Sequence, residues 1–426
     1  MAENRWRVLV GDDLGYVKGV DLKGGAEGAE WASERVTRFT NEKFEETEAE
    51  AGLEDTSSRS GAVVSVCALP QGDLETPVAI GRKSGRVDLL DASTGSYLGP
   101  PLLRADTLSK PDSELLGLRS CSPGLVSCTS GGIVELWRWE NSESGIVLPA
   151  EESDAGLDTV AATRAEPSKG GSVPGRVVEA FEVSSSGSGT DVKIATGGRE
   201  NNLKVWDLET GEAVFVGRSP KPNELGIWDK PWITCMSFLP QASPTSQVIL
   251  CGTANHQLRL YDWRVKRRPV MELEWGENRI TCLCLDDPGV PEKVWCANAI
   301  GQIRLLDLKM NYSMTTSPAE GMSMAGSLKG SLGCVKSLQR PPDASKPLLL
   351  SCGLDRFVRV FDLRKRKQVC SVYLKQYLKA LHVVEAEEVQ EAAPARSRSL
   401  DDVEESEYVH EVDEDRKRKK RRKGSK

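Results

Sequence analysis

One unit recurs seven times along the 426-residue chain, and this repeat constrains the fold more than any other feature. Each copy has an aliphatic run, a turn of small or polar residues, and a second run that closes with an aliphatic or aromatic residue followed by Asp. In the third copy Arg replaces this Asp. In chain order the copies close at Asp21, Asp91, Arg138, Asp207, Asp262, Asp307 and Asp362.

Apolar and polar residues alternate within each copy, as at Leu203 and Val205, which is the period of a β-strand. A further short apolar strand precedes most copies, as at 233–236 and 335–338. Together with a fourth, outer strand such as 269–275, each repeat makes a four-stranded antiparallel blade, and such blades stack radially. We therefore predict an all-β fold, a seven-bladed β-propeller over residues 1–384.

The two ends of the repeat array predict how the ring closes. The first copy begins directly with its second strand, at 6–10, and one extra first strand follows the last copy, at 378–381. We expect this C-terminal strand to complete the first blade, because closure removes the exposed strand edges that invite aggregation.

Three segments do not fit the repeat. An acidic loop is expected at 42–60, and a flexible insertion rich in Ser, Gly, Glu and Ala at 140–175. The tail, 385–426, is expected to be disordered because charged residues dominate it: 385–415 carry 13 acids against two arginines. The net charge of −7 averages this acidic stretch with a basic run that follows it.

The basic run near the C-terminus is predicted to be a nuclear or nucleolar import signal recognised by importin. A non-specific nucleic-acid tail is a compatible alternative. The run consists of Arg416, Lys417, Arg418, Lys419, Lys420, Arg421, Arg422 and Lys423.

The sequence favours an intracellular, soluble, non-catalytic protein. It has no apolar stretch of about 18 residues for a membrane span, and its first residues lack the apolar core of a secretory signal. The 11 cysteines and 3 histidines show no metal-ligand spacing, so the cysteines are expected to be reduced and buried. No phosphate-binding loop or nucleophile elbow is present, and we expect no enzyme activity, cofactor, metal or small-molecule substrate.

Two basic clusters follow the repeat ends of blades 5 and 7, in the turns between third and fourth strands. These turns should emerge on one face of the ring, where their positive charges could contact RNA phosphates. The alternative is that they are ordinary charged surface turns. The clusters are Arg264, Lys266, Arg267, Arg268 and Arg364, Lys365, Arg366, Lys367.

The opposite face is expected to carry a protein-binding surface, because exposed aromatic side chains beside charges often dominate interfaces. Trp232, four residues after the first candidate aromatic, is instead expected to pack as blade core. The candidates are Arg199, Glu200, Asn201, Trp228, Asp229, Lys230, His256, Asp355 and Arg356.

Several runs in the second half of the chain resemble the family of WD repeat-containing protein 74, a family of WD-repeat propellers. They include GGRENNLKVWDL (197–208), IWDKPWITCMSFLP (227–240), SLKGSLGCVKSLQ (327–339) and VYLKQYLKAL (372–381). The match covers blades 4 to 7 and the closing strand well, and blades 1 to 3 loosely. The chain lacks the Gly-His pairs of many WD repeats, which leaves a repeated hydrogen-bond network through His without support.

The resemblance implies a scaffold in nucleolar assembly of the large (60S) ribosomal subunit and in pre-rRNA processing. The implied partners are other pre-60S assembly factors, pre-ribosomal RNA and a nuclear AAA-type ATPase. Two alternatives remain: a WD-repeat adaptor of a chromatin or ubiquitin-ligase complex, and an enzyme using the central channel.

Overall fold

The computed structural model divides the chain into two units, 1–387 and 388–426, and the described residues all belong to the first. The structure describes residues 4–24, 31–39, 61–69, 76–98, 114–121, 124–138, 140–142, 145–147, 158–160, 178–184, 192–208, 210–222, 225–226, 228, 230–240, 248–287, 290–308, 322–343 and 346–385. The predicted acidic loop, the import run and all of the tail after 385 lie outside these ranges.

The described residues form seven antiparallel blades, six of four strands and one of three. Blades 1 to 3, each given from the innermost strand outward, are β29 (Leu378–Glu385), β1 (Asn4–Asp12), β2 (Val17–Gly24), β3 (Trp31–Phe39); β4 (Val63–Ala68), β5 (Pro77–Arg82), β6 (Val87–Asp91); and β7 (Leu115–Cys121), β8 (Gly124–Thr129), β9 (Val134–Arg138), β12 (Asp158–Val160). Blades 4 and 5 are β13 (Val178–Val183), β14 (Lys193–Gly198), β15 (Asn201–Asp207), β16 (Ala213–Val216); and β17 (Ile233–Leu239), β18 (Val248–Thr253), β19 (Gln257–Asp262), β20 (Met271–Glu274). Blades 6 and 7 are β21 (Ile280–Asp287), β22 (Val290–Asn298), β23 (Ile303–Leu308), β24 (Met322–Leu328); and β25 (Val335–Gln339), β26 (Leu348–Gly353), β27 (Phe357–Asp362), β28 (Lys367–Tyr373).

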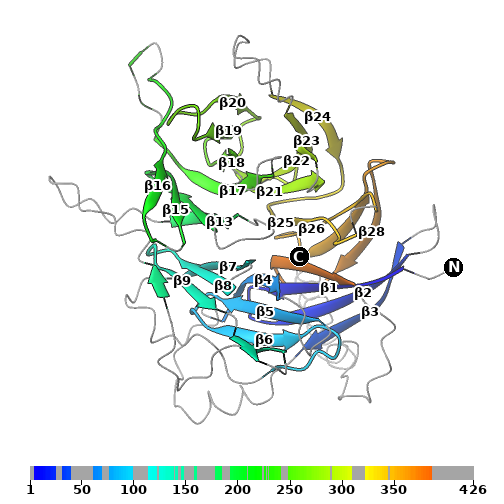
Figure 1. The fold of residues 1–426 in the computed structure, drawn as a ribbon. Helices are drawn as coiled ribbons and strands as arrows, with labels where there is room; N and C mark the ends of the chain where they lie inside the picture. Colours follow the sequence, from blue (N-terminus) through cyan, green and yellow to red (C-terminus); the bar gives the residue numbers. More distant parts are fainter. Residues whose placement is uncertain are drawn as a thin grey trace, which may run out of the picture. The chain divides into compact units, whose positions relative to one another are not determined.

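The innermost strands follow one another around a closed ring. Each contacts the next, in the order β4, β7, β13, β17, β21, β25, β29 and back to β4. Figure 1 shows these strands around the centre, with the outer strands of each blade toward the periphery. The prediction of a seven-bladed β-propeller is therefore confirmed.

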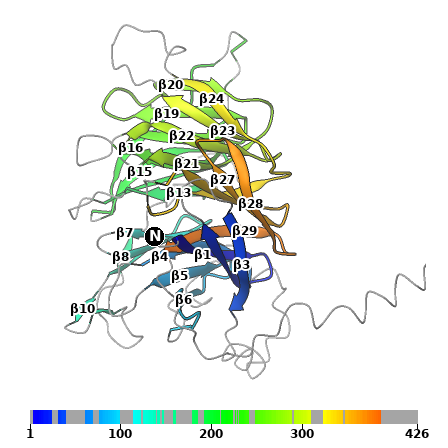
Figure 2. The same cartoon turned by 90° about the vertical axis from the view of Figure 1, so that its right-hand side faces the viewer.

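The ring closes through the predicted C-terminal strand. β29 pairs with β1 in antiparallel register, which places Leu381 opposite Val10 and Glu385 opposite Trp6. Figure 2 shows the orange β29 beside the dark blue β1, two strands from opposite ends of the described chain. The closing strand is longer than predicted, since it runs four residues beyond Leu381.

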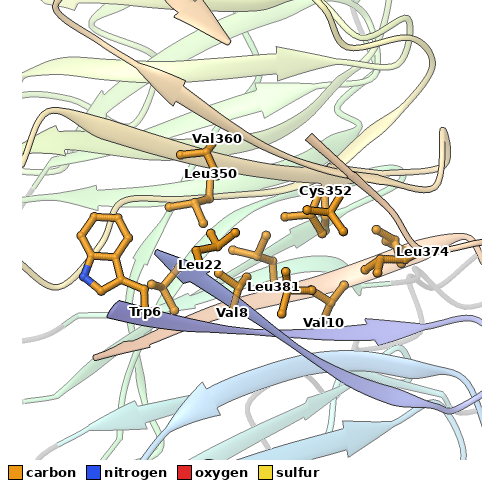
Figure 3. Packing of buried hydrophobic residues seen from close by; sticks show 14 of the residues in the cluster. Trp6, Val8, Val10, Leu22, Leu350, Cys352, Val360, Leu374 and Leu381 are labelled. Carbon is orange, nitrogen blue, oxygen red and sulfur yellow. The ribbon is translucent and has the colours of Figure 1, made fainter. Parts of the chain in front are cut away.

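Seven apolar clusters of described residues hold neighbouring blades together. The cluster between blades 7 and 1 joins Trp6, Val8 and Leu381 of blade 1 to Leu350 and Val360 of blade 7 (Figure 3). Second strands such as β18 and β26 are buried at every position, because neighbouring blades cover both of their faces. Burying one such aliphatic side chain stabilises the fold by about 1.5–3 kcal/mol.

Buried cations add polar links between neighbouring blades. Arg82 of blade 2 pairs with Asp88 at 2.6 Å and donates to the carbonyl of Gly15 in blade 1 at 2.9 Å. Lys18 of blade 1 donates to the carbonyl of Leu374, which follows blade 7, at 2.9 Å. A buried charge is tolerated only when it is paired and hydrogen-bonded, so these contacts fix how adjacent blades meet.

The described parts of the predicted insertion 140–175 form three short strands. β10 (Glu140–Ser142) and β11 (Gly145–Val147) form a hairpin. β12 pairs with β9 and supplies the outermost strand of blade 3. The fourth strand of this blade therefore comes from a segment that the repeat pattern did not include.

Candidate binding surfaces

The antiparallel blades create two families of loops. The top face carries the turns between second and third strands, together with the connections that lead into each first strand. The bottom face carries the turns between third and fourth strands. Aspartates that end the third strands hold the bottom turns: Asp262 Oδ1 accepts the Arg264 amide at 3.0 Å, and Asp362 Oδ1 accepts the Arg364 amide at 2.8 Å. This is the turn-fixing role expected of a side chain that offers acceptors to the backbone.

The basic turn of blade 5 is only partly available for binding. Arg264 makes a bidentate ion pair with Asp262, with Nη2 at 2.7 Å and Nε at 3.0 Å from the two carboxylate oxygens. Arg268 is half-buried and donates through Nε to the Ser219 carbonyl of blade 4 at 3.3 Å. Lys266 and Arg267 are exposed. Two of the four cations of this turn therefore bind other groups of the protein, and Lys266 and Arg267 are the two that the sequence prediction retains as candidates for RNA.

The basic turn of blade 7 is fully exposed. Its members Arg364, Lys365, Arg366 and Lys367 all lie at the surface, and Lys365 Nζ is 4.0 Å from Asp362. The Arg366 guanidinium lies so close to Gly326 of blade 6 that a Cβ there would be 2.9 Å from it.

Each basic turn contacts the preceding blade. The carbonyl of Arg267 accepts the amide of Arg218 in blade 4 at 2.8 Å, and Arg366 lies against Gly326 of blade 6. The two clusters thus occupy equivalent positions two blades apart, with blade 6 between them. Their combined action on a long polyanion stays a prediction.

Trp232 is held in place at the top of blades 4 and 5. Its side chain is half-buried, and its Nε1 donates to Glu179 Oε2 at 2.8 Å. The guanidinium carbons of Arg199 and Arg279 lie 4.9 Å and 5.9 Å from its ring centroid. Cation–π contacts of this kind favour a fixed ring, and they leave the two arginines at the surface.

Trp228 is the exposed aromatic of this region, with 58% of its surface accessible. Beside it in sequence, Lys230 pairs with Glu200 at 2.8 Å. Asn201 is 3% exposed and therefore supports the turn from within, and His256 is half-buried. Asp229 lies outside the described residues.

Asp355 and Arg356 form the top turn of blade 7. Asp355 pairs with Arg359 and accepts the Leu332 amide at 3.1 Å. Arg356 lies over the Tyr377 ring at 4.8 Å and donates to the Tyr377 hydroxyl at 3.3 Å. The turn is therefore tied to the connections on both of its sides.

The structure adds residues that the sequence reasoning missed. A shallow recess at the junction of blades 7, 1 and 2 is lined by Asp13, Lys83, Leu354, Tyr377 and Lys379. Burial lowers the pKa of Lys379, the Asp13 carboxylate opposes this shift, and the like charges of Lys83 and Lys336 add to it. One sequence signal was available: Lys336 and Lys379 occupy the second position of their first strands, where β17 has Thr234.

The described residues show no arrangement suited to catalysis by a metal or a thiolate. No group of three or more His, Cys, Asp or Glu side chains among them is placed to hold a metal ion. All 11 cysteines are free, and burial raises the pKa of Cys67, Cys128 and Cys235 to about 12. No helix suited to crossing a lipid bilayer occurs in the part of the chain that the structure describes.

Comparison with known proteins identifies the relatives of this propeller. No family model matches the chain. WD repeat-containing protein 74 of Bos taurus is 29% identical over 384 residues, covering 89% of this chain and 82% of the relative, and the Mus musculus protein of that name matches equally. Ribosome biogenesis protein NSA1 of Meyerozyma guilliermondii is 27% identical over 234 residues, covering 50% of this chain and 57% of the relative. These matches span the blades described above, and over most of its length the chain is similar to the proteins named WD repeat-containing protein 74.

Proposed function

We propose that this protein is a non-catalytic binding platform in ribosome biogenesis. The similarity of about half of the chain to proteins named for ribosome biogenesis carries the proposal, together with the similarity of 89% of the chain to WD repeat-containing protein 74. The fold supports it, since a closed ring of blades offers rigid surfaces whose loops vary while the core stays fixed. The stage that we propose is nucleolar assembly of the large (60S) subunit and the accompanying pre-rRNA processing.

Both loop families contribute to the proposed platform. The exposed cations of the bottom turns, Lys266, Arg267 and 364–367, have the chemistry to contact phosphates of pre-ribosomal RNA. The top turns combine exposed apolar and charged side chains, such as Trp228 and Lys230, which suit a protein partner. Other assembly factors would occupy these surfaces, and a nuclear AAA-type ATPase would act on the assembled complex.

The basic run 416–423 is proposed as the importin-binding signal that brings the chain to the nucleus. The proposal includes no reaction and no cofactor. The adaptor of a chromatin or ubiquitin-ligase complex is a less favoured function, because relatives from two yeasts are named for ribosome biogenesis.

Sucrose-gradient sedimentation of the tagged full-length protein from cell extract tests the proposal. We expect co-migration with large-subunit precursors that contain unprocessed rRNA, and absence from mature ribosomes. Sedimentation as free protein, or with chromatin or ubiquitin-ligase subunits in place of precursors, contradicts it.

A further inference from the structure

We propose that the top face of blades 6, 7 and 1 is a docking surface for a protein partner that presents an acidic segment bearing aliphatic or aromatic side chains. We call it the crescent surface, and it comprises the blade 6 turn at Ile300 with segments 329–336, 354–359 and 374–379. The inference rests on the proposed function as a binding platform, and it names the kind of partner that this face fits.

Large apolar side chains are exposed in succession along the crescent surface. Leu332 is 74% exposed, Ile300 48%, Tyr377 44% and Leu354 36%. Single exposed apolar residues are common, but a series on one face is characteristic of interaction sites. These side chains come from three blades, so no single turn accounts for them.

Backbone contacts place these residues next to one another. A Cβ on Gly301 would lie 2.7 Å from the Ser331 carbonyl, so the turn that carries Ile300 abuts the connection that carries Leu332. The Leu332 amide donates to Asp355 Oδ2 at 3.1 Å, which joins that connection to the top turn of blade 7. The exposed side chains therefore form a continuous surface.

The same contacts continue into blade 1. Arg356 of the blade 7 turn stacks on the Tyr377 ring at 4.8 Å, and the Tyr377 carbonyl accepts the Asp13 amide at 3.0 Å. The recess described above, with Leu354 on one side and Lys379 on the other, lies at this end of the crescent surface. A partner could place an apolar side chain against Leu354 and a carboxylate next to Lys379 there.

The crescent surface is strongly positive. Its three segments contain six cations and one acid; the acid, Asp355, pairs with Arg359, which is buried, so the exposed charge of the surface comes from the other five cations. Of the acids next to the recess, Glu114 is paired with Lys83 at 2.7 Å, which leaves Asp13 to face the lysines. The cations are Lys329, Lys336, Arg356, Arg359, Lys375 and Lys379.

This combination favours a protein over a nucleic acid. Binding of single-stranded nucleic acid relies on cations and stacking aromatic rings, and leucine or isoleucine side chains add nothing to phosphate recognition. An acidic segment with apolar side chains satisfies both parts of the surface, because its carboxylates complement the lysines and its apolar groups cover Leu332 and Ile300. Burial lowers the pKa of Lys379 despite the opposing effect of the Asp13 carboxylate, so a further carboxylate from a partner would stabilise the charged form of this lysine.

The test selects binders for the full-length protein from a displayed library of random dodecapeptides. Recovered peptides are synthesised, labelled and titrated by fluorescence polarisation. An apolar variant, Ile300→Ser with Leu332→Ser, and a charge variant, Lys329→Glu with Lys336→Glu, remove one component each. The matched controls are Leu225→Ser, at a top-face residue outside the crescent surface that is 82% exposed, and Lys365→Glu, on the bottom face.

We expect peptides rich in Asp or Glu with Leu, Ile or Phe, whose Kd rises at least tenfold in both variants and less than twofold in both controls. Unchanged circular dichroism and melting temperature establish that the variants remain folded. Failure to recover such peptides, or equal binding to the variants, overturns the inference. A 20-nucleotide RNA whose binding is lost in the charge variant but kept in the apolar variant assigns the face to nucleic acid, which also overturns it.

The sucrose gradient separates this inference from the proposed function. If the wild-type protein co-migrates with large-subunit precursors while the peptide test fails, only the crescent surface is wrong. If the peptide test succeeds while the wild-type protein leaves the precursors unbound, the surface is right and the ribosomal role is wrong.

Discussion

The substitution Leu381→Ala tests whether the closing strand stabilises the ring. Leu381 lies on β29 and is 5% exposed. It belongs to the apolar cluster between blades 7 and 1, together with Val8 and Leu350 (Figure 3). Both neighbouring blades contribute to its surroundings, so removing this side chain weakens the packing between blades 7 and 1, which we call the seam.

The size of the effect follows from burial and from the rigidity of the site. Truncation of a buried leucine to alanine costs about 2–5 kcal/mol, and the cost rises when the surroundings cannot collapse into the cavity. Here hydrogen-bonded ladders fix the strands on both sides, β1 beside β29 and β26 in blade 7. We therefore expect a loss in the upper half of that range, about 3.5–5 kcal/mol, which is a large part of the roughly 5–15 kcal/mol that stabilises a typical protein.

Urea unfolding of the full-length protein, followed by tryptophan fluorescence, measures this loss. Leu225→Ala is the matched control, because the same atoms are removed from a side chain that is 82% exposed, and its free energy of unfolding should stay within about 0.5 kcal/mol of wild type. Equal unfolding midpoints for Leu381→Ala and Leu225→Ala would refute the reasoning, since the seam would then carry no stability.

Four further predictions address other parts of the molecule. Burial lowers the pKa of His382 to about 4 from 6.5, so the stability that its neutral form contributes should be lost as pH falls from 6.5 through 4; His382→Gln should flatten that part of a denaturation profile against pH. Burial raises the pKa of Cys128 to about 12, so mass spectrometry should find it unmodified by iodoacetamide at pH 8 until urea unfolds the chain. Arg267→Glu with Arg364→Glu should weaken RNA binding and lower its dependence on salt, by about one unit of the log–log slope for each RNA phosphate that the variant no longer neutralises, and an unchanged slope would remove these turns from the RNA surface. Deletion of 416–423 should abolish nuclear accumulation of a fluorescent fusion while its melting temperature stays unchanged, and continued accumulation would assign import to another segment.

The architecture followed from local patterns in the sequence. Alternating apolar residues and the recurring Asp predicted the second and third strands of the blades and the turns beside them, because strand period and turn chemistry are properties of short segments. The missing first strand at the N-terminus and the extra copy at 378–381 predicted the closure. The pairing of these two segments could be predicted because a closed ring of blades has one vacant strand position in blade 1 and one spare strand to fill it.

The binding surfaces were predicted less completely, because they depend on contacts between blades. The pairing of Arg264 with Asp262 and the half-buried position of Arg268 reduce the basic cluster that the sequence suggested. The acid was in the sequence, two residues from Arg264, but the direction of its carboxylate depends on the fold of the turn. Asn201 was likewise predicted to lie on the protein-binding face, but its side chain is buried in the structure.

The sequence by itself determined how many blades the ring has, where the strands of the repeat lie and which strand closes the ring, because each repeat encodes its own hydrophobic period and turns. The tertiary structure decided which charges are available to partners and which apolar side chains meet. The outermost strand of blade 3 comes from a segment without the repeat pattern, and Lys336, Leu354 and Lys379 approach one another only through the radial packing of blades 7 and 1. Such contacts join positions far apart in the chain, and no local period records them.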